Sequence, residues 1–347
     1  MPDPGSAASS LTRADLAAVP VAVVERLRSA RRVLTVCHEN PEADALGSAL
    51  AVALIVEQHG AVATPVCVDP VPHLYDFMPL IERFRTGPDA AIAYDLVVVC
   101  DCGDLSRVGA SLLGADGLLE RVPIVNIDHH KSNDRFGAIA WVDPGAAATC
   151  EQVTLLARAM DVPLDAADGG LAADLLAGLV MDTATFQHPN ATPRTLRVAA
   201  ELVAAGAPLA ATSRLLYRTK PDEQLRLFGR VMARIETELD GRLLWSDLLD
   251  EDLAASGAVA SHSEGLIDLL SQAERAQVTL LFKEHGLETR ISVRTRDGGV
   301  DATDLVRPFG GGGHARASGA TLMRPLAEAR PLVLAEARRL ILDDVTG

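Results

Sequence analysis

Residues 123–130 read PIVNIDHH, a short apolar run followed directly by one aspartate and two histidines. A short run of this kind, rich in β-branched residues, is typical of a strand buried in a parallel sheet. A helical pattern at about 44–59 lies between the first two of three similar runs, residues 33–37, 62–68 and 95–100. Strands that alternate with helices predict an α/β fold, with a mostly parallel sheet and helices on both of its faces.

The character of the chain changes near Lys220 and Pro221. Helical patterns dominate residues 149–217, whereas a helix at about 222–235 precedes three strand-like segments, 242–246, 277–283 and 289–294. These segments predict a second sheet, and a last helix closes the chain. We therefore predict a disordered tail and an amphipathic helix within residues 1–29, a larger domain over 30–210, a linker over 211–224 and a smaller C-terminal α/β domain over 225–347.

Composition restricts the partners of the protein. The 347 residues carry 32 basic and 47 acidic side chains, a net charge of −15. Proteins that coat long nucleic acids usually have a basic surface, so we expect no binding to long duplexes. Aromatic residues make up 3% of the chain, which argues against a long groove for stacking single strands. Five irregularly spaced cysteines and the absence of a signal peptide or membrane span predict a cytoplasmic protein with reduced thiols.

Polar side chains gather where the predicted elements of the first domain end. Because ligands of parallel sheets bind at the carboxyl ends of the strands, these side chains should share one rim. One acidic residue among them ends an apolar helix at 171–182 rather than a strand. The set comprises His38, Glu42, Asp44, Asp101, Asp128, His129, His130 and Asp182.

So many carboxylates at one rim would repel one another unless positive charge lay between them. Mixed carboxylate and imidazole ligands suit Mn²⁺, Fe²⁺, Co²⁺ or Zn²⁺ better than Ca²⁺, and the set is large enough for two ions. Each member also has a simpler interpretation: His38 as a loop residue, Asp101 as a strand-end cap, the two adjacent histidines as surface residues. Their coincidence at one rim favours a metal site.

A glycine run at 310–313 marks the second domain, followed by His314 and Arg316. Successive glycine amides permit a close backbone approach and an anion-binding nest, although a flexible turn has the same composition. Arg294 and Arg296 lie on or near a predicted strand and are suited to bind phosphate, or else belong to a solvated face.

Five motifs in order resemble the DHH phosphoesterase superfamily, and in particular its DHH/DHHA1 branch of nanoRNases, pAp phosphatases and cyclic-dinucleotide phosphodiesterases. The resemblance covers about residues 30–345. The motifs are HENPEADALGS at 38–48, VVVCDCGD at 97–104, DHH at 128–130, GLVMDT at 178–183 and FGGGGHARASG at 309–319.

The resemblance implies a role for each residue. One cation would be held by His38, Glu42 and Asp101, and the other by Asp44, Asp101, His129 and Asp182. Asp101 would bridge the two ions, His130 would face the substrate phosphate, and Asp128 would orient the histidines. The family usually has aspartate where this chain has Glu42, so we expect the first cation to be shifted.

The implied activity is hydrolysis of short oligoribonucleotides, pAp, or linear and cyclic dinucleotides by water activated between two cations. Mn²⁺ is the expected ion, with Mg²⁺, Co²⁺ or Fe²⁺ as alternatives, and the family implies a homodimer. Two other functions remain open: a phosphatase for a non-nucleotide substrate, and a nucleotide-binding regulator with a weakened metal site. The implied substrate contacts, besides His130, are Arg294, Gly311, Gly312, Gly313, His314 and Arg316.

Overall fold

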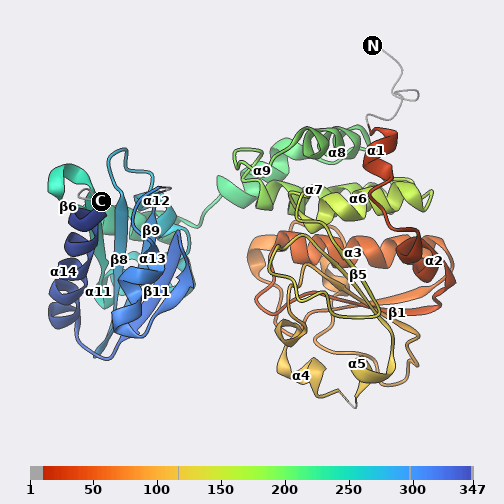
Figure 1. The fold of residues 1–347 in the computed structure, drawn as a ribbon, viewed down its shortest axis with the longest axis horizontal. Coiled ribbons are helices and arrows are strands. Elements are labelled where there is room, and N and C mark those ends of the chain that lie inside the picture. Colours follow the sequence, from red (N-terminus) through yellow and green to blue (C-terminus); the bar gives the residue numbers. More distant parts are fainter. Residues whose placement is uncertain (1–10, 116, 297, 345–347) are drawn as a thin grey trace, which may run out of the picture. The chain divides into compact units, whose positions relative to one another are not determined.

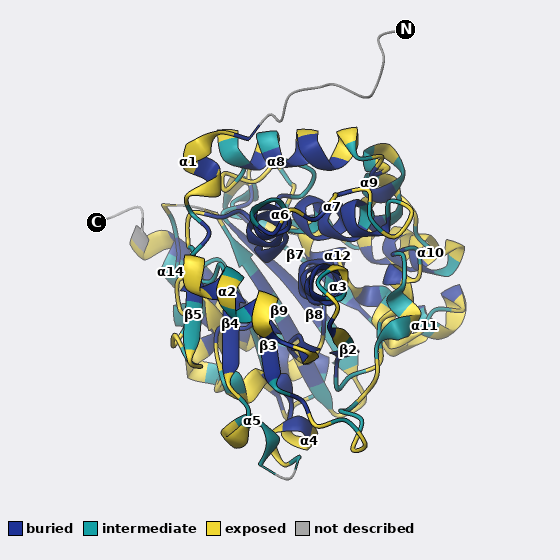
Figure 2. Cartoon of the chain, turned by 90° about the vertical axis from the view of Figure 1, so that its right-hand side faces the viewer, coloured by how far each residue is buried: buried dark blue, intermediate teal, exposed yellow. Residues whose placement is uncertain are grey.

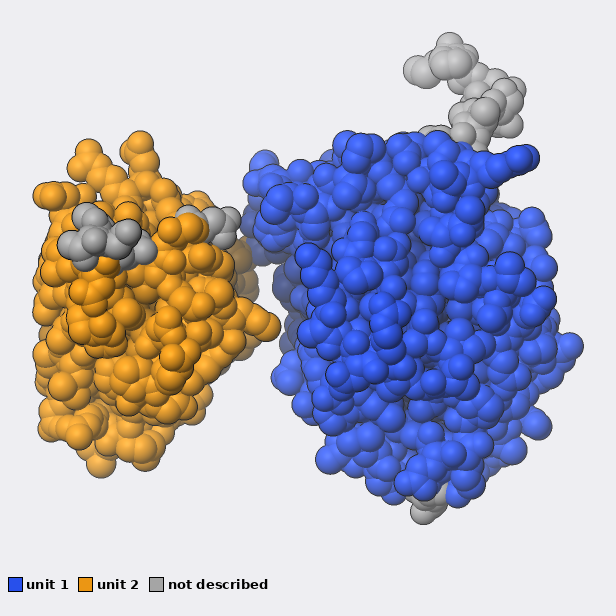
Figure 3. Space-filling model, in the orientation of Figure 1, with its two compact units in different colours: residues 1–219 blue, residues 220–347 orange. Residues whose placement is uncertain are grey.

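The structure is a computed structural model that describes residues 11–115, 117–296 and 298–344. The chain divides into two compact units, residues 1–219 and 220–347, and each is described by itself (Figure 3). The tail expected over residues 1–10 lies outside the described residues. Within the described part of the chain, no helix has the length and apolar character needed to cross a bilayer.

The first unit is built on a five-stranded parallel sheet in the order β2-β1-β3-β4-β5 (Figure 1). The strands are β1 (Arg32–Val36), β2 (Val62–Val66), β3 (Leu96–Cys100), β4 (Ile124–Asp128) and β5 (Ile139–Val142). The helices are α1 (Arg13–Leu16), α2 (Val21–Ser29), α3 (Ala43–Gln58), α4 (Ala110–Leu113), α5 (Leu118–Arg121), α6 (Thr149–Ala159), α7 (Gly170–Asp182), α8 (Pro193–Ala204) and α9 (Leu209–Tyr217), with 3₁₀ turns η1 (His73–Tyr75), η2 (Ile81–Arg83) and η3 (Leu105–Val108).

Both faces of this sheet are covered. Val33, Val98 and Ile127 belong to the apolar cluster that includes α3, α6 and α7. Val97 and Val99 belong to a second cluster, to which α4 and α5 contribute on the opposite face. Helix α3 lies at the centre of the first cluster and is buried from Ala43 to Val56 (Figure 2). The predicted parallel sheet with helices on both faces is confirmed.

Three sequence-based expectations differ from the structure. The single helix expected over 14–29 is broken into α1 and α2, because Pro20 lacks an amide hydrogen and adopts an extended conformation before α2. Strand β5 was not predicted, since its four residues are too few to show a clear pattern. The segment 211–224, expected to be a linker, is mostly helical, and only residues 218–221 separate α9 from the next helix.

The second unit contains a six-stranded sheet in the order β10-β11-β9-β8-β7-β6, in which only β7 and β8 pair in parallel among the described strands. The strands are β6 (Glu236–Glu238), β7 (Leu243–Leu248), β8 (Val278–His285), β9 (Glu288–Thr295), β10 (Gly312–His314) and β11 (Ala317–Leu322). The helices are α10 (Asp222–Met232), α11 (Asp250–Ser256), α12 (Leu266–Leu270), α13 (Ala302–Val306) and α14 (Leu326–Asp344), with 3₁₀ turns η4 (Leu239–Gly241), η5 (Ala260–Ser263) and η6 (Arg307–Phe309).

Helices pack on both faces of the second sheet as well. Phe282, Ile291 and Val293 pack with α13 and α14 in one apolar cluster. Leu244 and Leu281 pack with α10 and α12 in another. The predicted second α/β domain is therefore also present.

Asp174 is a buried carboxyl group in α7 whose two oxygens make no hydrogen bond with any described residue. Burial, together with the nearby charge of Glu82, raises its pKa well above the usual range. The folded protein therefore retains a proton there that the unfolded chain loses above a pH of about 4. The stability that this proton provides is lost as the pH rises through the pKa of the folded state.

We predict that Asp174→Asn, which cannot ionise, raises the free energy of unfolding at pH 7 by roughly 1–3 kcal/mol. The gap between the variant and the parent should widen as the pH rises from about 4, and chemical denaturation at several pH values would measure it. A gap that stayed constant across this range would show that ionisation of Asp174 is not the cause.

Candidate metal centre

The polar residues predicted to share a rim lie together at the carboxyl ends of β1, β3 and β4. The register pairs Val36 with Val99 and Cys100 with Ile127, so the residues that follow these strands come side by side. Glu42 immediately precedes α3, Asp44 lies in its first turn, and Asp182 is the last residue of α7. The rim thus receives side chains from three strand ends and two helix ends.

Asp101 lies at the centre of this group and is fully buried. Its φ of 55° is in the left-handed region, which a residue other than glycine seldom adopts. The oxygen Oδ1 accepts a hydrogen bond from the Thr149 hydroxyl at 3.1 Å and lies 3.5 Å from Nε2 of His129. The oxygen Oδ2 is buried without a hydrogen-bond partner in the described residues and lies 3.7 Å from Nε2 of His38.

One group of candidate ligands consists of His38, Glu42 and Asp101, whose donor atoms all lie within 4.8 Å of one another. Nδ1 of His38 donates a hydrogen bond to the Glu39 carbonyl at 2.6 Å. Because a carbonyl oxygen only accepts, this bond leaves Nε2 with its lone pair directed to the site. Although the Glu42 side chain is longer than that of aspartate, its carboxylate lies within 4.8 Å of the donor atoms of His38 and Asp101.

A second group consists of Asp44, His129 and Asp182, again with donor atoms within 4.8 Å of one another. Nε2 of His129 lies 3.2 Å from Oδ2 of Asp182. The carboxylate of Asp44 accepts hydrogen bonds from the backbone amides of Thr149 and Cys150, at 2.7 and 2.8 Å. These amides begin α6, and a helix N-terminus favours a negative charge.

Asp128 is occupied by hydrogen bonds that fix the histidine pair. Its Oδ1 accepts from the His129 amide at 2.8 Å and from Nδ1 of His130 at 2.7 Å, and its Oδ2 accepts from Asn133 at 2.6 Å. The His130 side chain is 39% exposed, compared with 16% for His129. His130 is therefore the histidine of this pair that is more accessible to a bound molecule.

Sequence reasoning assigned no role to Thr149, Asn133 or Gly178, although Gly178 belongs to the motif at 178–183. A β-carbon at Gly178 would lie 2.6 Å from Oδ1 of Asp44 and 2.5 Å from Sγ of Cys150, so glycine is required where α7 passes α3. Two of the three have a sequence signal: Gly178 is the first residue of the motif at 178–183, and Asn133 is a polar residue shortly after the end of a predicted strand. Thr149 acts through contacts that join segments far apart in the chain.

The charges of the site shift the protonation of its members. Burial and the nearby charges of Asp182 and Asp101 raise the pKa of Glu42 to about 7. Burial also raises the pKa of Asp182. Burial opposes the charged form of His129, but its contact with Asp182 and the charge of Asp44 outweigh this and raise its pKa to about 10.

These observations fit divalent cations. Two ligands that bind one ion at about 2.1 Å each lie roughly 3–4 Å apart, which matches the separations of 3.2–3.7 Å between the imidazole nitrogens and carboxylate oxygens. The unpartnered Oδ2 of Asp101 and the raised pKa of Glu42 both indicate that positive charge is needed at this rim.

The two arginines predicted to contact substrate, Arg294 and Arg316, make hydrogen bonds within the second unit. Nε of Arg294 donates to Asp268 at 2.8 Å. Arg316 donates to Thr295 and to the carbonyls of Arg296, Gly299 and Val300, so its guanidinium holds the loop before α13. These contacts account for both arginines without a ligand.

The glycine run is a turn that leads into a strand rather than a nest over its whole length. Gly310 has a φ of 74°, and β10 begins at Gly312. β-Carbons at Gly311 and Gly313 would lie 2.4 and 2.6 Å from carbonyl oxygens of β11, so packing requires both glycines. Gly312 and His314 are exposed, and no such packing requirement applies to Gly312.

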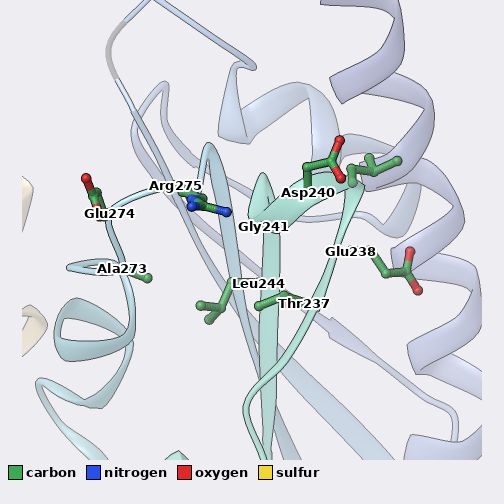
Figure 4. A pocket seen from close by; sticks show the side chains of 9 residues that line it. Thr237, Glu238, Asp240, Gly241, Leu244, Ala273, Glu274 and Arg275 are labelled. Carbon is green, nitrogen blue, oxygen red and sulfur yellow. The ribbon is translucent and has the colours of Figure 1, made fainter.

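A pocket in the second unit lies between the β6–β7 connection and residues 273–275 (Figure 4). Its lining includes Glu238, Asp240, Glu274 and Arg275, and none of the predicted substrate residues. Glu238 is also engaged by Arg338 through two hydrogen bonds. The pocket therefore has no relation to the predicted substrate contacts.

Comparison with known proteins identifies the family of the chain. Residues 32–181 match the DHH family, N-terminal domain, and residues 248–343 match the DHHA1 domain. A bifunctional oligoribonuclease and PAP phosphatase NrnA from Thermus thermophilus is 34% identical over 287 residues, which cover 82% of each chain. The chain belongs to the DHH family.

The NrnA of Bacillus subtilis (strain 168) is 28% identical over 293 residues, which cover 82% of this chain and 87% of that one. The fold also resembles that of an exopolyphosphatase-related protein from Bacteroides fragilis, with a TM-score of 0.79 at 20% identity over 96% of this chain and 98% of the other. The predicted family and the predicted class, a phosphoric ester hydrolase, are confirmed.

We predict that Gly178→Ala lowers the free energy of unfolding of the first unit by about 1–3 kcal/mol and weakens metal binding, because the new methyl group displaces Asp44. Gly229→Ala is the matched control: Gly229 is an exposed residue within α10, and nothing lies within 4 Å of the place that its new methyl group would take. The control should stabilise the second unit by up to about 1 kcal/mol. Thermal unfolding and Mn²⁺ titration would measure both effects, and equal behaviour of the two variants would contradict the close-packing argument.

We also predict that Mn²⁺ raises the unfolding temperature more at high pH than at low pH. In the metal-free protein, Glu42 has its pKa raised to about 7, so its stabilising contribution is present below about 4.5 and lost as the pH rises through about 7. A cation must displace this proton and the one on His129, so its effect should grow over this interval. Thermal unfolding with Mn²⁺ or with a chelator would test this, and an effect of Mn²⁺ independent of pH would contradict it.

Proposed function

We propose that this protein hydrolyses short oligoribonucleotides and pAp. The observation that carries the proposal is that the two ligand groups adjoin at the buried carboxylate of Asp101. Asp101 belongs to one group, and Nε2 of His129 in the other lies 3.5 Å from its Oδ1. The names of the relatives from Thermus thermophilus and Bacillus subtilis, each a bifunctional oligoribonuclease and PAP phosphatase, support this substrate class.

We assign one divalent cation to His38, Glu42 and Asp101, and a second to Asp44, Asp101, His129 and Asp182. Mn²⁺ is our first choice, because mixed nitrogen and oxygen ligands suit it. Bound there, the ions would supply a water molecule of lowered pKa and neutralise charge on the phosphoryl group. We assign Asp101 to both ions, because its unpartnered Oδ2 lies beside His38 of one ligand group and its Oδ1 lies beside His129 of the other.

His130 is our candidate for the contact with the substrate phosphate. Its Nδ1 is committed to Asp128, which leaves Nε2 for a hydrogen bond to a phosphoryl oxygen. The raised pKa of His130, caused by the hydrogen bond to Asp128 and opposed by burial, favours the charged form that a phosphate would prefer. Asp128 thus positions the ring and promotes its positive charge.

In the second unit, His314 and Gly312 are the best candidates for recognising the remainder of the substrate, because both are exposed beside the edge of the sheet. Arg294 would need to exchange its ion pair with Asp268 for a phosphate, and that pair is partly solvated and therefore weak. Arg316 is assigned to substrate less directly, since it supports the neighbouring loop. A cytoplasmic homodimer is proposed on the basis of the family alone.

The purified protein with Mn²⁺ should convert pAp to AMP and shorten a ladder of di- to tetraribonucleotides, with cyclic dinucleotides as a third test class. Product analysis by chromatography would distinguish these substrates. Inactivity on all three classes would remove the proposed function.

Within this assay, we predict that Asp101→Asn and His129→Ala each abolish measurable turnover while the fold survives. Asparagine tolerates the left-handed backbone of Asp101, so the unfolding transition should persist. The asparagine side chain lacks the negative charge that both ligand groups need to hold a cation. Leu196→Ala, on the exposed side of α8, serves as the control with unchanged turnover. Activity retained by folded Asp101→Asn would contradict the bridging role.

A further inference from the structure

One aromatic side chain of this chain differs from all the others in its exposure. The sequence contains seven phenylalanines, three tyrosines and two tryptophans, all within the described residues. Among them, only Tyr217 is exposed, at 38% of its surface. A single exposed aromatic side chain is not unusual by itself, so the position of Tyr217 and its neighbours decide whether it has a role.

Tyr217 is the last residue of α9 (Figure 1), and its hydroxyl group is fixed beside the metal centre. The hydroxyl donates to the carbonyl of Met181 at 2.7 Å, and Met181 directly precedes the candidate ligand Asp182. Burial of the hydroxyl and the charges of Asp182 and Glu42 raise the pKa of Tyr217 to about 12. The phenol therefore stays protonated and close to both ligand groups, while the ring retains exposed surface.

A positively charged side chain, Arg214, lies near the Tyr217 ring on α9. Arg214 precedes Tyr217 by three residues on α9, a spacing that places two side chains on the same helix face. Arg214 is exposed, and within the described part of the chain its side chain pairs with no acidic group. A fixed aromatic face with a nearby free cation is the combination that binds a nucleotide, because the ring stacks on the base and the cation attracts a phosphate.

We propose that Tyr217 is the base-stacking residue of the metal centre. The base of the nucleotide that carries the scissile phosphate stacks on its ring, and Arg214 attracts a further phosphate. This rests on the proposed function and deepens it, because it makes a nucleobase part of the recognised substrate. Every base offers a π-face, so the preference is for nucleotides without regard to base sequence. A single platform also matches short substrates better than long strands.

The test compares pAp with ribose 3′,5′-bisphosphate, the same compound without its base, using the full-length protein with Mn²⁺. Tyr217→Leu should raise KM for pAp about tenfold and leave its kcat unchanged. KM for the compound without a base should not change. Tyr217→Trp should keep the preference for pAp, and Tyr217→Phe should do so with a smaller loss from the missing hydroxyl. Leu196→Ala is the control for a lost exposed apolar side chain.

A binding measurement keeps the inference separate from the proposed function. The 2-aminopurine analogue of pAp loses fluorescence when its base stacks, so it should be quenched by the parent protein and by Tyr217→Trp in Mg²⁺, but not by Tyr217→Leu. Failure of the parent to hydrolyse pAp would remove pAp from the proposed substrates, while this quenching would still support stacking. Equal rises in KM for both bisphosphates, or equal quenching by the parent and Tyr217→Leu, would overturn the role of Tyr217.

Discussion

The buried negative charge of Asp101 is the constraint on which the rest of the metal centre depends. A carboxylate with no exposed surface is costly unless hydrogen bonds or positive charges compensate it. Burial alone would raise the pKa of Asp101, but its contact with His38 and the charges of His129 and His130 outweigh burial and hold the pKa below the usual value. The Thr149 hydroxyl adds a hydrogen bond to the carboxylate. One of its oxygens still has no hydrogen-bond partner among the described residues, and a cation at the candidate site would supply the remaining compensation.

The helices of the first unit are arranged to bring further negative charge to the same place. Glycine at 47 and at 178 allows α3 and α7 to pass so closely that a β-carbon at either position would collide with the other helix. This close packing places Asp44 and Asp182 beside each other, and the first amides of α6 bind Asp44. The packing of the core and the geometry of the site are therefore coupled: replacing Gly178, which packs directly against Asp44, would displace that candidate ligand.

The acidity of the whole chain is compatible with an anionic substrate because recognition is local. The cations that approach a phosphate would be the metals, His130 and a few arginines, rather than a basic surface. The exposed ring of Tyr217 adds a neutral contact, which is insensitive to the net charge of −15. Such a site suits a ligand with one or two bases better than an extended strand, since only one aromatic ring is exposed in the described chain.

The sequence by itself determined the parallel sheet, because short apolar runs rich in β-branched residues, such as residues 95–100, alternate with helical patterns. It also determined the family and the set of side chains at the rim, since these follow strand and helix ends that the pattern locates. It predicted neither the break at Pro20 in the first helix nor the short strand β5, whose signals are too local or too brief. Only the tertiary structure decided that Arg316 supports a loop, that Thr149 and Gly178 shape the metal centre, and that Tyr217 lies beside it. The physical reason is that these roles arise from contacts between segments distant in sequence, and no local pattern of residues encodes such a contact.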